Sequence, residues 1–339
     1  MSRENYIGVD WENCKYRLIV TFRNTSVAIE MSSWTISPVW KRDSSFLGNC
    51  KKCTNMPTFV PKRLAWRPDI PDFRDWSIAN SEVNTIFQSI KDSINPPSSV
   101  LLDEYFPHEV AAQDEFGSST AHACVSLIQY FEYRSFGKVV EPSAEFLSRV
   151  SSRFDLGSCS VCTSLRSTIM AIQKIGLPPA SMLDSPSYQH GSCELDPLLF
   201  TFGEPYEAMI YVRLDHDYGQ TGTALHHVKS FLSAGFPIVF GFSVPSSLSY
   251  DGQIDFRPSF DSIRGGQAAV LTGYDDHRTL ATRGAFRIRC SWGTDWGTRG
   301  SGWMPYTFLK SGLARDFWVI VRPDWLSSME FKRPTCINR

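Results

Sequence analysis

Ser119 follows Gly117 and Ser118 at the expected start of a helix, where a side chain could act as a nucleophile. Residues 119–134 carry apolar side chains at helical spacing, which predicts a long, largely buried helix. Unpaired backbone N–H groups and the helix dipole favour negative charge at such an N-terminus, and they lower the pKa of a thiol from about 8.5. A serine hydroxyl is not activated in this way, so Ser119 would need an adjacent base to take its proton.

Gln267 and Cys290 lie on two apolar runs that predict neighbouring strands. A hairpin that pairs Thr272 with Ala285 would also place Gln267 opposite Cys290, and directly opposed residues have Cβ atoms about 5 Å apart. We therefore expect the two side chains to form one local unit. The amide of Gln267 has no basic lone pair with which to accept a proton from Ser119. Nothing expected beside Cys290 lowers the pKa of its thiol, so we interpret it as a small buried residue.

Three ordered motifs around these positions resemble those of the papain-like (peptidase C1) family. Residues 113–121, QDEFGSSTA, are similar to the family's nucleophile segment, in which a Gln precedes Gly-Ser-Cys at the same spacing. Residues 265–276, GGQAAVLTGYDD, resemble the Gly-His-Ala strand, and residues 291–297, SWGTDWG, resemble the motif that begins with the catalytic Asn. Because the motifs occur in order, the resemblance is highly specific, and it extends over about residues 64–325.

The resemblance implies that all three catalytic positions are substituted. Ser119 stands at the nucleophile position, Gln267 at the base position and Cys290 at the position of the Asn that orients the base. Gln113, at the oxyanion-hole position, and the structural Trp292 are retained. Losing the base of a comparable triad costs about 10⁶ in turnover, about 8 kcal/mol of barrier. Catalysis by the family mechanism is therefore not expected.

The fold that the resemblance implies is α+β with two lobes, a helical lobe and an antiparallel, barrel-like β lobe, with a peptide-binding cleft between them. The cleft residues would be Gln113, Ser118, Ser119, Cys162, Gln267, Cys290 and Trp292. Cys162 would lie where the family has a glycine-rich edge that binds the substrate backbone, which suggests altered specificity. His122, three residues after Ser119, is expected to be a packed structural residue rather than a substitute base.

The sequence divides into four regions: an N-terminal β-rich region (1–63), an extended propeptide-like linker (64–98), a papain-like domain (99–325) and a C-terminal tail (326–339). Residues 16–22 and 26–31 are rich in β-formers and predict a hairpin in the first region. Helices are also expected over 163–175 and 223–234, where turn-forming Gly and Pro residues follow the apolar pattern. The order of elements is helical half first and β half second.

The composition is that of a globular protein, with 42% apolar and 20% charged residues in 339. A net charge of −1 with scattered Lys and Arg argues against binding nucleic acid or an anionic membrane. The sequence contains neither an apolar run of ~20 residues nor a secretory signal pattern, and nine cysteines suit free thiols better than a disulfide framework. We expect an intracellular, cytoplasmic protein without a metal or cofactor.

These observations predict a pseudopeptidase, a papain-like protein that binds a polypeptide segment or a partner protein through the former substrate cleft without cleaving it. One alternative is an active hydrolase, a peptidase or acyl transferase that uses Ser119 or Cys290 in a non-standard site. A second alternative is a structural subunit of a larger assembly.

Overall fold

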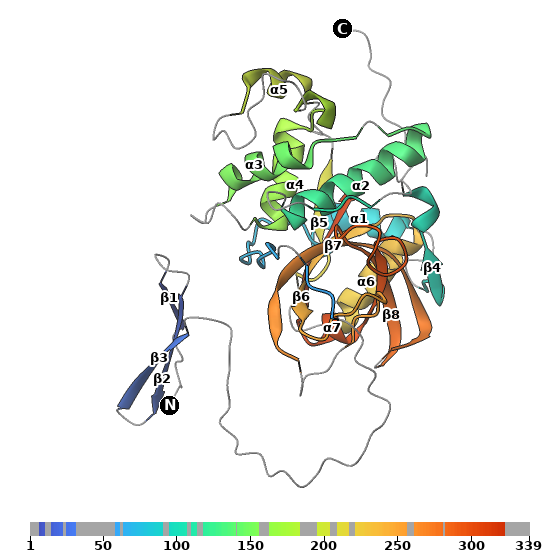
Figure 1. Cartoon of the computed structure of the whole chain (residues 1–339). Helices are drawn as coiled ribbons and strands as arrows, with labels where there is room; N and C mark the ends of the chain where they lie inside the picture. The colour runs from blue at the N-terminus through green and yellow to red at the C-terminus, as the bar shows by residue number, and fades with distance from the viewer. Residues whose placement is uncertain are drawn as a thin grey trace. The chain divides into compact units, whose positions relative to one another are not determined.

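The computed structural model describes most of residues 58–322 and three strands near the N-terminus. Within 58–322 the residues not described are 62–63, 91–94, 107–109, 114–117, 140, 156–162, 184–194, 204–208, 217–220, 256–260 and 281. The chain separates into two compact units, one comprising Met1–Met56 with Ser262–Arg264 and the other comprising the remainder (Figure 1). The boundaries of the four regions expected from the sequence stay predictions, and the tail 326–339 lies outside the described residues.

The N-terminal unit contains an antiparallel sheet in the order β1-β2-β3, formed by Ile7–Asp10, Lys15–Phe22 and Thr25–Met31. β2 and β3 pair from Tyr16 opposite Met31 to Phe22 opposite Thr25. This register confirms the hairpin predicted from the β-branched and aromatic residues of the two runs. We did not predict β1, which adds to the free edge of β2.

The helices of the larger unit lie mainly in its first half. They are α1 (Ser81–Ser89), α2 (Ser119–Phe136), α3 (Ala144–Phe154), α4 (Leu165–Ile175) and α5 (Pro197–Phe202). α2 and α4 confirm the helices predicted over 119–134 and 163–175. α2 ends at Gly137, whose φ of 63° suits the left-handed cap. α1 lies within the segment that we expected to be an extended linker.

The second half forms a sheet in the order β5-β10-β6-β7-β8-β9, with β4 paired to β7. β6 to β9 are neighbours in chain order, and β10 lies between β5 and β6. Its strands are β4 (Ser99–Leu101), β5 (Ile210–Arg213), β6 (Ile238–Pro245), β7 (Ile263–Thr279), β8 (Arg283–Arg289), β9 (Ser301–Pro305) and β10 (Ala314–Val321). α6 (Thr221–Ser233) confirms the third predicted helix, and α7 (Thr307–Lys310) is a single turn.

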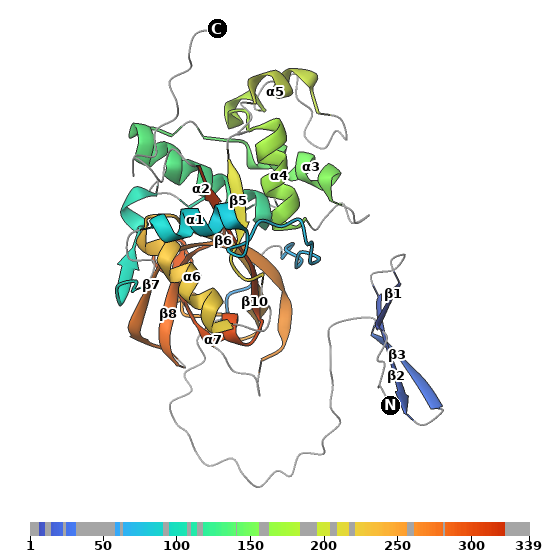
Figure 2. The same ribbon diagram turned by 180° about the vertical axis from the view of Figure 1, so that it is seen from behind.

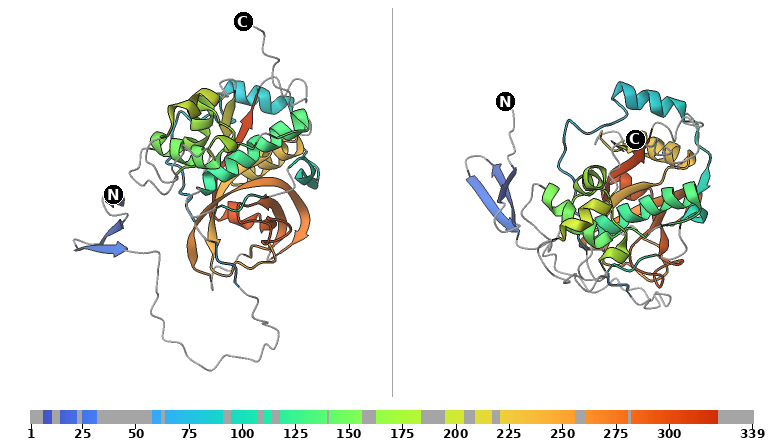
Figure 3. Two further views of the ribbon diagram at one scale, coloured as in Figure 1. Left: turned by 45° about the horizontal axis from the view of Figure 1, so that its top comes forward. Right: turned by 90° about the horizontal axis from the view of Figure 1, so that it is seen from above.

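The two halves form the two lobes of an α+β fold, as predicted from the sequence. Figure 2 shows α2 to α5 above the curled sheet, and Figure 3 shows the barrel-like curvature of its strands. α3 and α4 pack against each other and against α2, while α2 also contacts β6. α2 therefore lies where the lobes meet, with Leu127 and Ile128 among its buried residues. The N-terminus of α2 is consequently held close to the sheet.

The register between β7 and β8 corrects our expectation for Gln267 and Cys290. The structure pairs Asp275, not Thr272, with Ala285, and it pairs Val270 with Arg289. Cys290, one residue past β8, is consequently not opposite Gln267. The error arose because Asp275 and its neighbours were interpreted as the start of a loop, whereas β7 runs on to Thr279. The carboxylate of Asp276 is accommodated in the long strand because it accepts hydrogen bonds from Lys229 and Tyr306.

Candidate functional site

Ser119 is the first residue of α2, at the position expected from the sequence, and it is fully buried. Its Oγ accepts a hydrogen bond of 3.2 Å from the backbone N–H of Ala268 on β7. Ser118, the residue before the helix, has its Oγ 2.9 Å from Thr163 Oγ1, which lies just before α4. Hydrogen bonds therefore connect the start of α2 to both the sheet and the helical lobe.

Gln267, which the motif resemblance assigns to the base position, is also fully buried and forms a polar cluster with Gln113 and Ser291. Its Nε2 donates to Gln113 Oε1 at 3.1 Å and to Ser291 Oγ at 3.2 Å. The hydroxyl of Ser291 donates to the same Gln113 Oε1 at 2.6 Å. The amide of Gln267 thus acts as a donor to these neighbours, and it holds no lone pair basic enough to deprotonate Ser119.

Gln113 is the residue that the motif resemblance assigns to the oxyanion hole, and its side-chain oxygen accepts the two hydrogen bonds of this cluster. Its backbone N–H also donates to the carbonyl oxygen of Ser291 at 2.8 Å. An oxyanion hole stabilises a reaction through donors aimed at the developing negative charge. Gln267 and Ser291 both donate hydrogen bonds to Oε1 of Gln113. The side-chain amide of Gln113 is therefore fixed within a buried hydrogen-bond network.

Cys290 is buried, as expected, with 2% of its surface exposed. Burial raises the pKa of its thiol well above the ordinary value, so the thiol form predominates at neutral pH. Its backbone N–H donates to the carbonyl oxygen of Gly300. The indole of Trp292 lies 4.7 Å from that of Trp296 in an edge-to-face contact. Cys290 and Trp292 therefore have the environments of packed core residues.

Trp66 contacts both lobes close to Gln267. Its backbone N–H donates to the carbonyl oxygen of Gly266 at 3.0 Å, and it forms an isolated parallel bridge with Thr163. A Cβ atom added to Gly266 would lie 2.4 Å from the carbonyl oxygen of Trp66, and one added to Gly241 would lie 1.8 Å from its indole. Glycine is therefore required on both strands for this approach. Since Ser119 has no exposed surface, a substrate cannot reach its hydroxyl in this arrangement.

Phe59 precedes Trp66 in the chain, and we call the described residues 58–61 and 64–67 the covering segment. Its backbone N–H donates to the carbonyl oxygen of Leu248 at 2.8 Å, and its ring lies 5.3 Å from that of Trp292. Phe59 thus contacts the ring of Trp292, and Trp66 contacts the strand that carries Gln267. Sequence analysis placed Trp66 in the linker and did not assign it to the site.

A buried network of ion pairs anchors the segment that follows Trp66. Arg166 on α4 donates from Nε to Asp75 at 2.7 Å. Asp69 accepts from the indole N–H of Trp318 at 2.9 Å, and its backbone N–H donates to Asp316 at 2.7 Å. Burial raises the pKa values of Asp69 and Asp316 above their ordinary value. These contacts tie residues 69–75 to α4 and β10.

The structure brings most of the expected cleft residues together. Gln113 and Gln267 share a hydrogen bond, and Ser119 bonds the residue after Gln267. Cys290 is not bonded to Gln267 by the contacts described, and Cys162 lies outside the described residues. Sequence reasoning missed Ser291 as a member of the cluster. Its position between Cys290 and Trp292 in the third motif was the available signal.

Comparison with known proteins supports the resemblance deduced from the motifs. No family model matches the chain. An uncharacterized peptidase C1-like protein of Acanthamoeba polyphaga mimivirus is 33% identical over 153 residues, which cover 39% of this chain and 48% of that protein. The chain therefore spans about half the length of this curated relative.

Solved structures extend the similarity to the fold. Xylellain, a cysteine protease from Xylella fastidiosa, superimposes with a TM-score of 0.61 at 28% identity, over 78% of this chain and 99% of xylellain. The chain has the papain-like cysteine protease fold. A procathepsin B from Trypanosoma congolense shows the same fold with a TM-score of 0.54 at 16% identity, over 77% of this chain and 86% of that one. The curated relative and xylellain agree with the resemblance found in the motifs, whereas the procathepsin B, at 16% identity, shows the fold alone.

Two findings concern membrane insertion and metal binding. Within the described part of the chain, none of the helices has the length and apolarity needed to cross a membrane. The same residues contain no group of three or more His, Cys, Asp or Glu side chains placed to hold a metal ion. The cytoplasmic location, the lack of a cofactor and the lack of nucleic-acid partners stay predictions.

Proposed function

We propose that this chain is a catalytically inactive papain-like protein, a pseudopeptidase, that binds a polypeptide segment or a partner protein through the former substrate cleft. The observation that carries the proposal is the hydrogen bonding of Ser119 and Gln267, which we assign to the nucleophile and base positions. The hydroxyl of Ser119 accepts a hydrogen bond from Ala268, and the amide of Gln267 is bonded to Gln113 and Ser291. The site therefore contains a buried hydroxyl without a neighbouring base at the family's base position.

The burial of Ser119 and Cys290 supports the same proposal. Covalent catalysis requires the reacting atoms to approach to about 3–3.5 Å, and Ser119 has no exposed surface. Cys290 is no better placed, since its burial raises the pKa of the thiol and leaves little thiolate to attack a carbonyl. Neither candidate nucleophile of the alternative hydrolase hypothesis has the environment that its reaction needs.

The contacts of Trp66 suggest how a polypeptide would bind. Its backbone already pairs with Gly266 on one lobe and with Thr163 on the other. An extended peptide forms the same kind of main-chain hydrogen bonds when it adds to a strand edge. We therefore expect a partner segment to displace residues 64–67 and to take over the backbone contacts of Trp66.

Hydrolysis of a broad pool of fluorogenic peptides tests the loss of catalysis. The wild type and Ser119→Ala are compared with a restored triple variant, Ser119→Cys with Gln267→His and Cys290→Asn, and with the same triple variant carrying Trp66→Ala. The wild type and Ser119→Ala are expected to be equally silent. Activity in the wild type that disappears in Ser119→Ala would contradict the proposal.

Binding is measured separately by capture of peptides from a displayed random library. Trp66→Ala is expected to retain more peptide than the wild type, because the competing indole and its segment are loosened. Trp303→Ala, which removes an indole from β9, is the matched control and is expected to behave as the wild type. Equal retention by all three proteins, at background level, would argue against a peptide-binding cleft.

A further inference from the structure

The covering segment carries two buried aromatic side chains, Phe59 and Trp66, which stand seven residues apart in the chain. On the basis of the polypeptide binding proposed above, we propose that the partner segment carries two aromatic residues at this same spacing. One takes the place of Phe59 and the other takes the place of Trp66. The covering segment then resembles the ligand that displaces it, and the two rings are the side chains that the cleft selects.

The Phe59 site is formed by the rings of Tyr250, Trp292 and Trp296. The ring of Phe59 lies 4.9 Å from that of Tyr250 in an edge-to-face contact, 5.3 Å from that of Trp292 and 6.5 Å from that of Trp296. Aromatic pairs favour separations and tilts of this kind. Tyr250 is 46% exposed, so the wall of this site reaches the surface. A partner that displaced Phe59 without supplying a ring would leave these apolar faces in water, which is unfavourable.

The Trp66 site is a flat stretch of backbone on β6 and β7, at Gly241 and Gly266. A Cβ atom added to Gly241 would overlap the indole of Trp66, and one added to Gly266 would lie 2.7 Å from it. Only glycine lets a bicyclic ring approach two strands so closely. Since Trp66 is 7% exposed, the ring and this backbone cover each other. The site therefore suits a large, flat side chain.

A main-chain hydrogen bond accompanies each ring. The backbone N–H of Phe59 donates to Leu248 at 2.8 Å, and that of Trp66 donates to Gly266 at 3.0 Å. Any extended polypeptide can form such bonds, because they do not depend on the side chain. They therefore contribute affinity for a polypeptide of any sequence. The choice between sequences is made by the two side-chain sites.

The indole nitrogen of Trp66 contributes nothing to this selection. Its Nε1 is buried and has no hydrogen-bond partner among the described residues. A buried donor without an acceptor is destabilising. A flat ring of similar area without an N–H group, such as naphthalene, avoids this cost. The Trp66 site thus selects the area of the ring, and the covering segment is not its tightest ligand.

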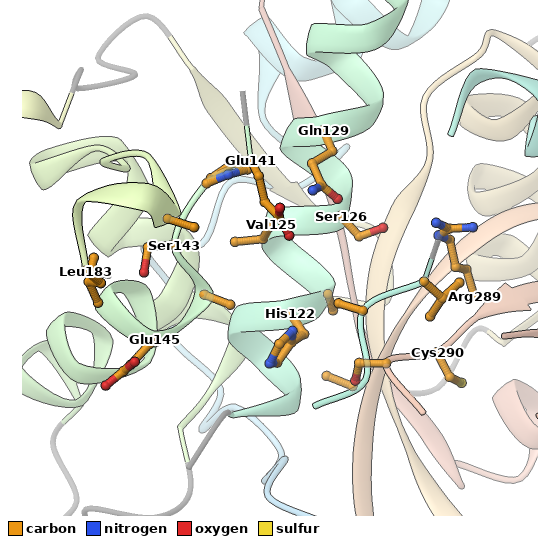
Figure 4. A pocket seen from close by; sticks show the side chains of 18 residues that line it. His122, Val125, Ser126, Gln129, Glu141, Ser143, Glu145, Leu183, Arg289 and Cys290 are labelled. Carbon is orange, nitrogen blue, oxygen red and sulfur yellow. The ribbon is translucent and has the colours of Figure 1, made fainter. Parts of the chain in front are cut away.

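A cavity of about 220 Å³ beside α2 is a competing location for a side chain of the partner (Figure 4). Figure 4 shows Ser126 of α2 among the side chains that line it, together with the charged Glu141 and Arg289. The lining contains no Phe, Tyr or Trp, and neither Phe59 nor Trp66 belongs to it. It therefore lacks the aromatic contacts that the Phe59 site offers to a ring.

The first test is fluorescence anisotropy of a labelled peptide with the sequence of residues 58–67, TFVPKRLAWR, titrated with the full chain carrying Phe59→Ala and Trp66→Ala. The peptide is expected to bind saturably. Peptides that carry Phe59→Ala or Trp66→Ala should bind at least about tenfold more weakly, the scale of one buried aromatic side chain. The Val60→Ala peptide is the matched control and should bind as the parent does, because Val60 is 67% exposed. A peptide with 2-naphthylalanine in place of Trp66 should bind at least as tightly as the parent.

The chain with Trp66→Ala alone is measured in parallel, since it retains Phe59 and more of its core. Both variant chains should bind the parent peptide more tightly than the wild type does. In the wild type the covering segment competes from the same chain, at an effective concentration of about 1 mM. Equal binding of all the peptides would overturn the aromatic pair while leaving a peptide-binding cleft in place. No saturable binding of any peptide by any of the three chains would overturn both proposals.

Further variants locate the second ring. Gly241→Ala is added to the Trp66→Ala chain, where the new Cβ has room because its three nearest atoms all belonged to the indole. It should weaken the parent peptide at least about tenfold, the scale of one buried aromatic side chain. Gly222→Ala, which meets no atom within 4 Å, is the matched control. Ser126→Leu fills the cavity of Figure 4 and should leave binding unchanged. Weaker binding in Ser126→Leu but not in Gly241→Ala would place the peptide in that cavity and overturn the proposal.

Discussion

The backbone N–H of Trp66 donates a hydrogen bond of 3.0 Å to the carbonyl oxygen of Gly266, the residue that precedes Gln267. This contact places a residue from the start of the larger unit against the strand that carries the former base position. Ser119, which begins α2 where the two lobes meet, bonds the residue after Gln267 on the same strand and is fully buried. Trp66 and Ser119 therefore contact the same strand on either side of Gln267.

Gly266→Ala is expected to loosen the covering segment. The new Cβ would lie 2.4 Å from the carbonyl oxygen of Trp66, so the segment must shift and its hydrogen bond to Gly266 is lost. Overpacking of this kind costs about 1–3 kcal/mol of unfolding free energy. We expect faster cleavage near Trp66 in limited proteolysis and a lower midpoint of urea unfolding.

Gly222→Ala is the control for this prediction. Gly222 lies in α6, and a Cβ added there meets no atom within 4 Å. Alanine is more favourable than glycine by about 0.5–1 kcal/mol in a helix interior, and Gly222 lies in the first turn, so this variant should be as stable as the wild type or slightly more stable. If Gly266→Ala were as stable and as resistant to proteolysis as Gly222→Ala, the close contact with Trp66 would be refuted.

Arg166→Met is expected to destabilise the protein by about 3 kcal/mol. It removes the guanidinium that is hydrogen-bonded to buried Asp75 and leaves this carboxylate with Arg213 alone, whose Nη1 lies 3.6 Å from Asp75 Oδ2. A buried carboxylate whose charge is only partly compensated is costly. Arg74→Met is the matched control, because Arg74 pairs with Asp72 while 76% of its side chain is exposed. An exposed pair contributes less than about 1 kcal/mol. Urea unfolding measures the loss of unfolding free energy in each variant. Equal losses in Arg166→Met and Arg74→Met would show that the buried ion pair of Asp75 contributes no more to stability than the exposed pair of Asp72.

Stability should depend on pH through Asp69 and Asp316. Burial raises the pKa of Asp69 in the folded protein above its ordinary value of 3.8. The folded state therefore binds the proton more tightly than the unfolded state, and this contribution to stability is fully present below the unfolded pKa. It is lost as pH rises through the folded pKa.

Asp69→Asn isolates this dependence, because asparagine retains a side-chain oxygen for the indole N–H of Trp318 but does not titrate. The unfolding free energy of the wild type minus that of Asp69→Asn is expected to fall as pH increases from about pH 4 to pH 8. Urea titrations at several pH values give this difference. A difference that rises with pH would mean that the carboxylate is stabilised, rather than destabilised, by folding.

Local patterns in the sequence were sufficient for several elements. The apolar spacing after Ser119 predicted α2, and the β-branched runs predicted the pairing of β2 with β3. The three ordered motifs predicted the α+β fold, and the assignment of Gln267 and Cys290 to the family's base and Asn positions stays a prediction. These features depend on side-chain identity and on periods of a few residues, both of which are directly visible in a sequence.

The tertiary structure decided the contacts between distant segments. Trp66 and Gly266 are far apart in the chain, and no local pattern specifies that they share a hydrogen bond. The register of β7 was likewise set by pairing along its full length to Thr279 and by partners such as Lys229, not by the apparent turn at Asp275. Side-chain types were therefore evident from the sequence alone. Their burial and partners were determined only when packing selected one arrangement of the whole chain, because a strand's pairing and a side chain's exposure depend on neighbours that are remote in sequence.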